Sequence, residues 1–179
     1  MEDAEQTGIF VEKMADFFRY NVKKGQEDAT LGEELEAVDN YIYILNVRFA
    51  GDIHFNKDVD ESLENVRVPS MILQPVVENA VNHGIRDIEW EGKIHLTVTG
   101  DADYIRISVK DNGKGMTPEQ IESVLSGNKE HCNEQSDSTG IGMNNVISRL
   151  ELYYEEPGLV EINSDGENKG TEVVIYIPV

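Results

Sequence analysis

Three short segments interrupt the apolar pattern of this chain, and their order constrains the fold more than any other feature. They are LQPVVENAVNHG (residues 73–84), DNGKGM (residues 111–116) and STGIGMNNV (residues 138–146). The first puts polar residues on an apolar helix, the second puts a carboxylate on a glycine-rich turn, and the third puts glycines where a helix begins. Each is common alone, so their joint occurrence is the informative feature.

The first segment predicts a helix over residues 70–83 with one polar stripe. Asn79, Asn82 and His83 stand at i, i+3 and i+4, so we expect them to share a face. Asparagine is a poor helix former and its oxygen suits Mg²⁺, which suggests a ligand. A solvated helix face explains the stripe about equally well. The opposite stripe is apolar and predicts a core face: Leu73, Val76, Val77, Ala80 and Val81.

The second segment follows a predicted strand over residues 104–110. Asp111 stands at the strand end, where its carboxylate could accept a hydrogen bond from the exocyclic amine of adenine. Gly113 and Gly115 would let the backbone approach a flat base. An ordinary Asp-Gly loop turn is the more frequent explanation when such a motif stands by itself.

The third segment predicts a helix start at Gly140 and Gly142. Free N–H groups at a helix start bind phosphates, and glycine removes side chains that would block them. The chain contains no Walker A pattern, and a lone Gly-x-Gly is a weak signal whose alternative explanation is a simple helix cap.

Periodicity predicts an α+β fold: helices on one face of a mixed, mostly antiparallel sheet. We expect helices over 5–24, 31–50, 70–83 and 141–154, and strands over 53–59, 93–99, 104–110, 159–163 and 171–178. A further short helix opens at Thr117, which offers a capping hydroxyl, with Pro118 in the first turn and Gln120 three residues on. The polar stretch 126–138 lies between the two glycine segments, where a mobile lid would be. The first two helices show no core of their own, so we expect them to pack on the rest or on another subunit.

The composition of the chain limits the partners that it can bind. The formal charge of −20 over 179 residues argues against nucleic acid or an anionic membrane as partner. A nucleotide would have to be held by backbone N–H groups, a divalent cation and a few local cations. The single cysteine, Cys132, excludes an internal disulfide and suits a reducing cytoplasm. No apolar run approaches the roughly 18 residues of a membrane span.

In this order and on these elements, the segments resemble those of the GHKL, or Bergerat-fold, ATP-binding proteins. The chain looks most like the C-terminal catalytic domain of the YesM/LytS-type sensor histidine kinases. Residues 73–85 resemble their N box, residues 111–116 and 138–154 their two glycine boxes, and residues 31–55 their linker helix. Gly170-Thr171 also matches. This resemblance implies a two-layer α/β sandwich of the Bergerat type preceded by helices.

The resemblance also implies roles for single residues toward ATP and Mg²⁺. Asn79 would bind Mg²⁺, with Glu78 at the edge of the metal, and His83 would contact ribose or phosphate. Asp111 would bind the adenine amine with support from Thr171. The remaining residues implied to contact the nucleotide are Gly113, Gly115 and Met116 in the first glycine box, Gly140, Ile141, Gly142 and Met143 in the second, and Asn82 as a weaker candidate. Lys114 and Arg149 are the nearest cations in sequence.

Two absences bear on the reaction. Hydrolytic relatives of the fold carry a water-activating Glu four residues before the metal-binding Asn, and Pro75 stands there instead. We therefore expect phosphoryl transfer rather than efficient hydrolysis. No histidine has the Pro-His-Phe-like context of the family's phosphoacceptor, so no catalytic residue is assigned; the four are His54, His83, His95 and His131.

These points predict a fragment of a protein histidine kinase. Residues 1–52 would be a helical remnant of the dimerisation and linker region, and residues 53–179 the ATP-binding domain. Its partners would be a phosphoacceptor helix absent from this sequence, a response regulator and a second copy bound through the N-terminal helices. The fragment would not insert into a membrane, would be inactive in autophosphorylation, and would be the cytoplasmic domain of a membrane-bound parent.

Three alternatives remain open from the sequence. The first is a non-catalytic GHKL nucleotide-binding module that serves as a conformational switch. The second is an anti-sigma-type serine/threonine kinase, which shares the fold. The third is a gyrase-like or chaperone ATPase, which Pro75 and the short chain disfavour.

Overall fold

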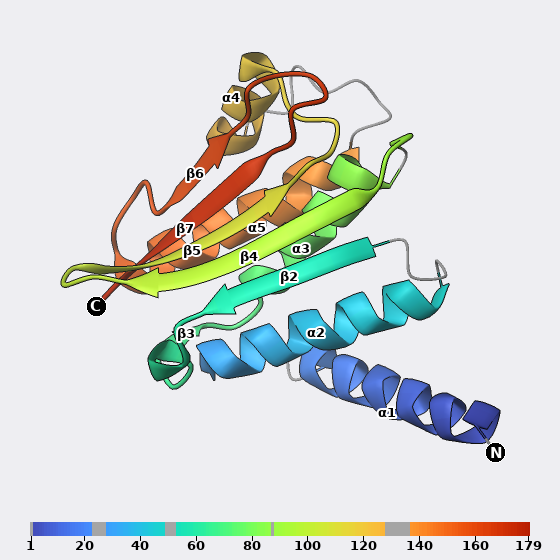
Figure 1. The fold of residues 1–179 in the computed structure, drawn as a ribbon. Coiled ribbons are helices and arrows are strands. Elements are labelled where there is room, and N and C mark those ends of the chain that lie inside the picture. The colour runs from blue at the N-terminus through green and yellow to red at the C-terminus, as the bar shows by residue number, and fades with distance from the viewer. Residues whose placement is uncertain (1, 23–27, 49–52, 87, 128–136) are drawn as a thin grey trace.

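The computed structural model of the chain describes residues 2–22, 28–48, 53–86, 88–127 and 137–179, with the side chains of all but residues 2–3 and 137–141. A five-stranded mixed sheet forms one layer (Figure 1). Its strands in spatial order are β2 (Ile53–Val59), β4 (Gly92–Gly100), β5 (Tyr104–Asp111), β7 (Glu172–Pro178) and β6 (Val160–Asn163). The β2–β4 pair is parallel and the other three pairs are antiparallel. The predicted mixed, mostly antiparallel sheet is confirmed.

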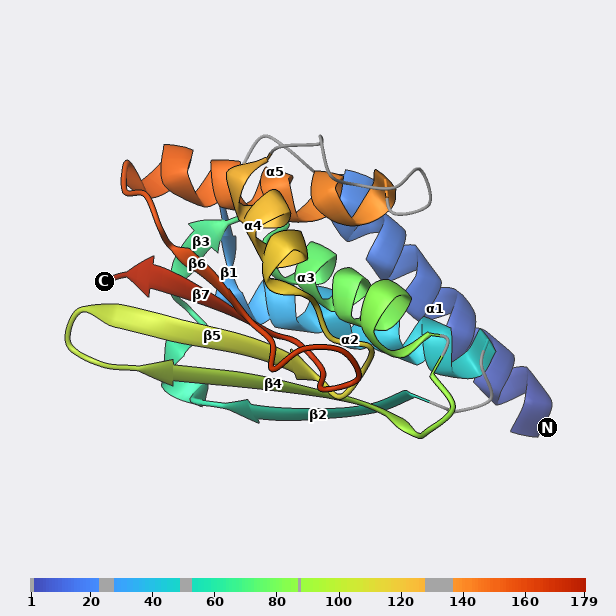
Figure 2. The ribbon, with the colours of Figure 1, turned by 90° about the horizontal axis from the view of Figure 1, so that it is seen from above.

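Helices form the second layer against one face of this sheet (Figure 2). They are α2 (Leu31–Arg48), α3 (Leu73–Asn79) and α5 (Asp137–Tyr154), with the short α4 (Pro118–Ser126) near the first turns of α5. Alternate strand positions point toward them and are almost fully buried: Ile94, Leu96 and Val98 on β4, and Ile105, Ile107 and Val109 on β5. This alternation is the reason why period-two apolar patterns predicted the strands correctly.

The two N-terminal helices differ in their relation to the core. Helix α2 contributes Leu31, Leu35, Val38 and Ile42 to the main hydrophobic cluster. Helix α1 (Glu2–Val22) contributes no described side chain to that cluster and packs on α2, where Phe17 stacks on Tyr41 with ring centroids 6.0 Å apart. The expectation that these helices pack on the rest of the chain is confirmed for α2. Within the described residues, no helix combines the length and apolarity needed to cross a bilayer.

The polar helix is not the regular helix expected over residues 70–83. It begins at Leu73, because Met71 has a positive φ of 64° that no α-helix accommodates. After Asn79 it continues as a π-helix, η2 (Ala80–Ile85). Such π-segments are rare and often occur at functional sites. The wider turn changes which side chains share a face, so the α-helical spacing argument fails beyond Asn79.

Several smaller features lie outside the sequence-based expectations. A two-stranded sheet joins β1 (Asp28–Thr30) to β3 (Arg67–Pro69), and η1 (Glu61–Leu63) is a 3₁₀ turn. Strands of three residues carry too little alternation to be recognised in a sequence. The last helix begins at Asp137, four residues before the expected start, so Gly140 and Gly142 follow the start of the helix and do not form it. The expected lid falls largely on residues 128–136, which lie outside the described residues.

The start of α4 has the capping box that its sequence predicted. The Thr117 side chain accepts a hydrogen bond from Gln120 N, and the Gln120 side chain accepts one from Thr117 N at 2.8 Å. We expect Thr117→Ala to lower the free energy of unfolding by about 1 kcal/mol, measured by urea denaturation. Glu122→Ala, an exposed change on the same helix, is the control; equal effects of the two changes would contradict a specific role for the cap.

Candidate nucleotide-binding site

The candidate site is organised around one buried carboxylate at the end of β5. Asp111 is 5% exposed and pairs in register with Ile94 of the neighbouring strand. Its Oδ1 accepts a hydrogen bond from Gly113 N at 2.8 Å. Burial raises the pKa of Asp111, while the backbone N–H groups of Gly113 and Thr171 lower it. Backbone donors therefore fix the orientation of the carboxylate without a cationic partner.

Three glycines allow the backbone to close around Asp111. A Cβ on Gly84 would lie 2.7 Å from Asp111 Oδ1, and a Cβ on Gly113 would overlap the Gly84 carbonyl group. Gly170 has a φ of +77°, and a Cβ there would overlap the Asp111 carbonyl oxygen. Lys114 N also donates to Gly84 O at 3.0 Å. The π-helix, the first glycine box and the turn before β7 are thus in direct backbone contact, which places two of the three sequence segments together.

Asn79 carries the most informative unsatisfied group of the site. Its Oδ1 is buried and has no hydrogen-bond partner among the described residues. A buried polar oxygen without a partner is costly, and native proteins keep such a group where a ligand, an ion or water satisfies it. No cluster of three or more His, Cys, Asp or Glu side chains with metal-binding geometry occurs among the described residues.

His83 lies near the first glycine box. It is half-buried, and both burial and the positive charge of Lys114 lower its pKa below 6.5. The imidazole is therefore neutral at pH 7, and Lys114 provides positive charge beside it.

This lowered pKa gives a direct test of the local geometry. We expect Lys114→Ala to raise the pKa of His83 toward 6.5, and Lys110→Ala, a change on β5 that is not among the causes of the shift, to leave it unchanged. An NMR titration of the imidazole measures both. The folded protein binds this proton less well than the unfolded chain does. The contribution of His83 to the free energy of unfolding therefore decreases as pH falls below about 6.5, and Lys114→Ala should make this decrease smaller. An unchanged His83 pKa in Lys114→Ala would place the ammonium group elsewhere.

Two predicted residues of the polar helix have other surroundings. Glu78 accepts a hydrogen bond from Gln74 Nε2 at 2.6 Å, and its charge contributes to the raised pKa of Tyr41 on α2. Asn82 is exposed and lines a cavity of about 480 Å³ with Arg48 and His54. Neither Asn79 nor His83 is among the described residues of that cavity, so the expected shared face does not extend to Asn82.

The second glycine box lies in the first turns of α5 and approaches the N-terminal part of α3. A Cβ on Gly142 would lie 3.9 Å from Pro75 Cβ, one helical turn before Asn79. Met143 is 1% exposed and belongs to the hydrophobic core. Gly140 and Ile141 lie in the same helix, and what surrounds them lies outside the part that the structure describes. Both glycine-rich segments therefore approach the polar helix, which is the first of the three predicted segments.

The remaining predicted residues lie around the first glycine box. Gly115 has a φ of +69°, and a Cβ there would overlap the Gly166 carbonyl oxygen. Met116 is half-buried, and its N–H donates to Ser164 Oγ at 3.0 Å. Thr171 is buried, and its carbonyl oxygen accepts a hydrogen bond from Asp111 N at 2.9 Å.

Sequence reasoning left Arg149 unplaced and missed Trp90. Arg149 donates to the carbonyl oxygen of Ser70, so it tethers α5 to the segment before α3. Trp90 Nε1 donates to Asn112 O at 2.9 Å, next to Asp111. No motif marks this tryptophan, although it is the only one in the chain and stands beside the glycine box as a natural fluorescence reporter.

Comparisons with known proteins identify the family of the chain. The family model described as "Histidine kinase" matches residues 1–53. Sensor histidine kinase YpdA of Escherichia coli is 34% identical over 90% of this chain, and YesM of Bacillus subtilis is 29% identical over 97%. The chain spans only 27% and 28% of the length of these two relatives. The mycobacterial sensor histidine kinase MprB shares the fold, with a TM-score of 0.61 and 18% identity over 86% of this chain and 97% of that one.

A second family model covers the part of the chain that holds the site. It matches residues 67–179, more than half of the chain, and includes the polar helix, both glycine boxes and Thr171. The chain belongs to the family of histidine kinase-, DNA gyrase B-, and HSP90-like ATPases.

Proposed function

We propose that the chain is the ATP-binding catalytic part of a sensor histidine kinase, which holds Mg-ATP and presents its γ-phosphate to a histidine. The observation that carries this proposal is the buried, unpartnered Oδ1 of Asn79, on a helix whose π-helical continuation is in contact with the Asp111 loop. Membership of an ATPase family supports ATP as the bound nucleotide, and the relatives named above are sensor histidine kinases.

The described surroundings support a division of roles around the nucleotide. Asp111 would accept a hydrogen bond from the adenine amine, because backbone donors hold its carboxylate and no cation among the described residues contributes to its pKa shift. Gly113, Gly115, Met116 and Thr171 would shape the base site. His83 is neutral, which favours a hydrogen bond to ribose over a charge contact with phosphate. Lys114 would provide a local cation beside His83 in this strongly acidic chain.

The phosphates and the metal would lie toward Asn79 and the second glycine box. Bound Mg²⁺ would neutralise phosphate charge, and the single amide oxygen of Asn79 suits an ion that takes its other oxygens from phosphates and water. The phosphate side of the site would be lined by Gly140, Ile141, Gly142 and Met143. Because the Met143 side chain is buried in the core, it would hold this part of α5 in place. Glu78 and Asn82 receive weaker support, since their described neighbours lie elsewhere.

The reaction that fits this site is transfer of the γ-phosphoryl group. The bond between the γ-phosphorus and the β–γ bridging oxygen breaks, a phosphorus–nitrogen bond forms on the acceptor imidazole, and ADP leaves. Phosphoryl transfer depends mainly on positioning and charge stabilisation. Pro75 provides no general base for water, which disfavours hydrolysis. We infer that the acceptor histidine lies outside this chain, because none of the four histidines has the Pro-His-Phe-like context of the family's phosphoacceptor.

The longer protein would use this part in a two-component system. Residues 1–52 would belong to its helical dimerisation and linker region, and residues 53–179 to its ATP-binding domain. The ends of the two family matches, at 53 and 67, support a boundary near this point, although α2 shares the core of the second part. A response regulator, a second copy of the chain and a membrane-bound parent are further parts of the proposal.

Nucleotide binding and hydrolysis together test the proposal. We expect the chain to bind Mg-ATP more tightly than Mg-GTP. Calorimetry and the fluorescence of Trp90 measure both affinities. We also expect no sustained release of inorganic phosphate. Sustained hydrolysis would favour an ATPase. No binding up to about 1 mM ATP, where the standard free energy is only about −4 kcal/mol, would refute the proposed function.

A further inference from the structure

A completely buried carboxylate on α2 holds the start of the polar helix. Glu34 is 0% exposed. It accepts hydrogen bonds from three successive backbone N–H groups, those of Met71 at 2.5 Å, Ile72 at 2.9 Å and Leu73 at 2.8 Å. The carboxylate therefore satisfies the donors that precede and open α3, the helix that carries Asn79.

This arrangement replaces an ordinary helix cap. Helices usually begin with a side chain that accepts from the first free N–H groups, but Ile72, the residue before α3, has no such bond to offer. A negative charge at this end is also favoured by the helix dipole. Since the cap comes from 37 to 39 residues away, the position of α3 depends on the position of α2.

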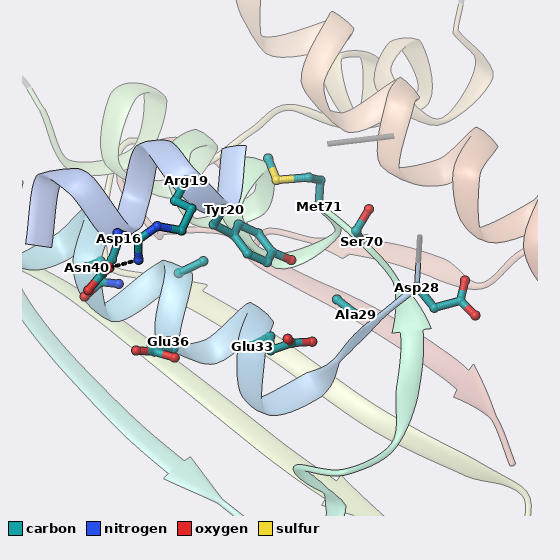
Figure 3. Close-up of a pocket in the computed structure, with 11 residues that line it drawn as sticks. Asp16, Arg19, Tyr20, Asp28, Ala29, Glu33, Glu36, Asn40, Ser70 and Met71 are labelled. Atoms are coloured by element: carbon teal, nitrogen blue, oxygen red, sulfur yellow. Dashed lines mark hydrogen bonds and ion pairs between the residues drawn. The ribbon is translucent and has the colours of Figure 1, made fainter. Parts of the chain in front are cut away.

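Helix α1 reaches the same carboxylate. The Tyr20 hydroxyl donates to Glu34 Oε1, the oxygen that also accepts from Met71 N. Burial and the nearby negative charge of Glu34 raise the pKa of Tyr20, so the hydroxyl keeps its proton and remains a donor. Figure 3 shows Tyr20 projecting from α1 toward the segment with Ser70 and Met71.

A second connection runs beside the first. Asn21, the next residue on α1, donates to Gln74 Oε1 at 3.3 Å, and Gln74 Nε2 donates to Glu78 Oε1 at 2.6 Å. Glu78 is the neighbour of Asn79 in the chain. Two adjacent residues of α1 therefore make polar contacts that lead to α3, one through its cap and one through its side chains.

We propose that Glu34 is a positioning residue for the nucleotide site, and that the Tyr20–Glu34 hydrogen bond couples the placement of α1 to that of α3 and Asn79. The inference rests on the proposed function. Tyr20 and Glu34 lie in the part of the chain matched by one family model, and Met71 to Leu73 open the part matched by the other. The carboxylate thus joins two separately recognised segments. A displacement of α1 removes one of the four donors that hold Glu34, and the first turn of α3 loosens with it.

Tyr20→Phe is the sharpest test, because it removes one hydroxyl on α1, outside the residues assigned to the nucleotide site, and leaves the ring in place. We expect affinity for Mg-ATP to fall about fivefold, the lower range of coupling between separate sites, with the loss visible in the Trp90 fluorescence titration. Glu34→Gln should have a larger effect. If its amide oxygen serves Ile72 and Leu73, its NH₂ group faces the N–H of Met71, which then loses its acceptor.

Matched controls separate positioning from general stability. Tyr43→Phe removes a hydroxyl from α2, and Glu36→Gln removes the same charge from the exposed side of that helix. Neither should change nucleotide affinity. A Tyr20→Phe protein that melts at a lower temperature but binds Mg-ATP as tightly as the wild type would overturn the proposal.

Amide hydrogen exchange distinguishes a failure of this inference from a failure of the proposed function. Without any nucleotide, Tyr20→Phe should increase exchange at residues 71–79 and leave β4 and β5 unchanged. If the wild type binds no ATP, the proposed function fails, and increased exchange would still support the mechanical link. Unchanged exchange in a folded variant would refute the link itself.

Discussion

Asp111→Asn should lower the affinity for Mg-ATP by about 10- to 100-fold, the range expected when a hydrogen bond to a charged group worth about 1.5–3 kcal/mol is lost. The carboxylate has two acceptor oxygens, and Gly113 N occupies one of them. An asparagine offers a single acceptor, which can serve either the loop or the adenine amine. Its NH₂ group would meet the amine donor to donor. Since the two side chains have almost the same shape, the loop should remain folded.

Calorimetry with ATP and GTP measures this effect. Guanine carries a carbonyl oxygen where adenine carries its amine, so the preference for ATP should weaken or reverse in Asp111→Asn. Asp103→Asn, which removes the same charge from an exposed position before β5, should bind ATP like the wild type. An Asp111→Asn protein with unchanged affinity and unchanged base preference would remove Asp111 from the adenine site.

The sequence predicted those parts of the molecule that depend on local pattern. Alternating apolar residues gave the strands, and the hydroxyl, proline and glutamine after Met116 gave the cap of α4. The grouping of Asp111 with Gly113 and Thr171 followed from motif order rather than from periodicity, whereas the close approach of Gly84 and Gly170 to Asp111 is seen only in the structure. Those motifs carry glycines because a Cβ would collide with the neighbouring backbone or with the Asp111 carboxylate.

Other parts could not be predicted, because they depend on contacts between distant segments or on a departure from regular geometry. Asn82 was grouped with His83 by α-helical spacing, but the helix widens into a π-helix at Ala80 and Asn82 lines a different cavity. The contact of Glu34 with Met71 to Leu73 spans almost forty residues, and a glutamate on an expected helix normally indicates an exposed face. Burial of that carboxylate becomes evident only when α2 and α3 are packed together.

Asn79→Ala should make binding of ATP insensitive to Mg²⁺, with affinity in the presence of the metal reduced about tenfold or more. Loss of groups that only support a metal ligand already costs about 10- to 100-fold in metal affinity. Affinity for ATP measured in excess chelator should stay near the wild-type value. Calorimetry with and without Mg²⁺ gives both numbers, and Asn56→Ala, a change of the same kind at an exposed position on β2, is the control.

The stability of Asn79→Ala decides between a ligand and a structural side chain. An asparagine that served the fold would cost stability when removed, because its partners would lose a hydrogen bond. The Oδ1 of Asn79 has no partner among the described residues, and alanine is the better helix former. We therefore expect the variant to unfold at the same or a higher urea concentration than the wild type while it loses the metal dependence. A variant that is clearly destabilised and still responds to Mg²⁺ would contradict the proposed role, because the side chain would then serve the fold and not the metal.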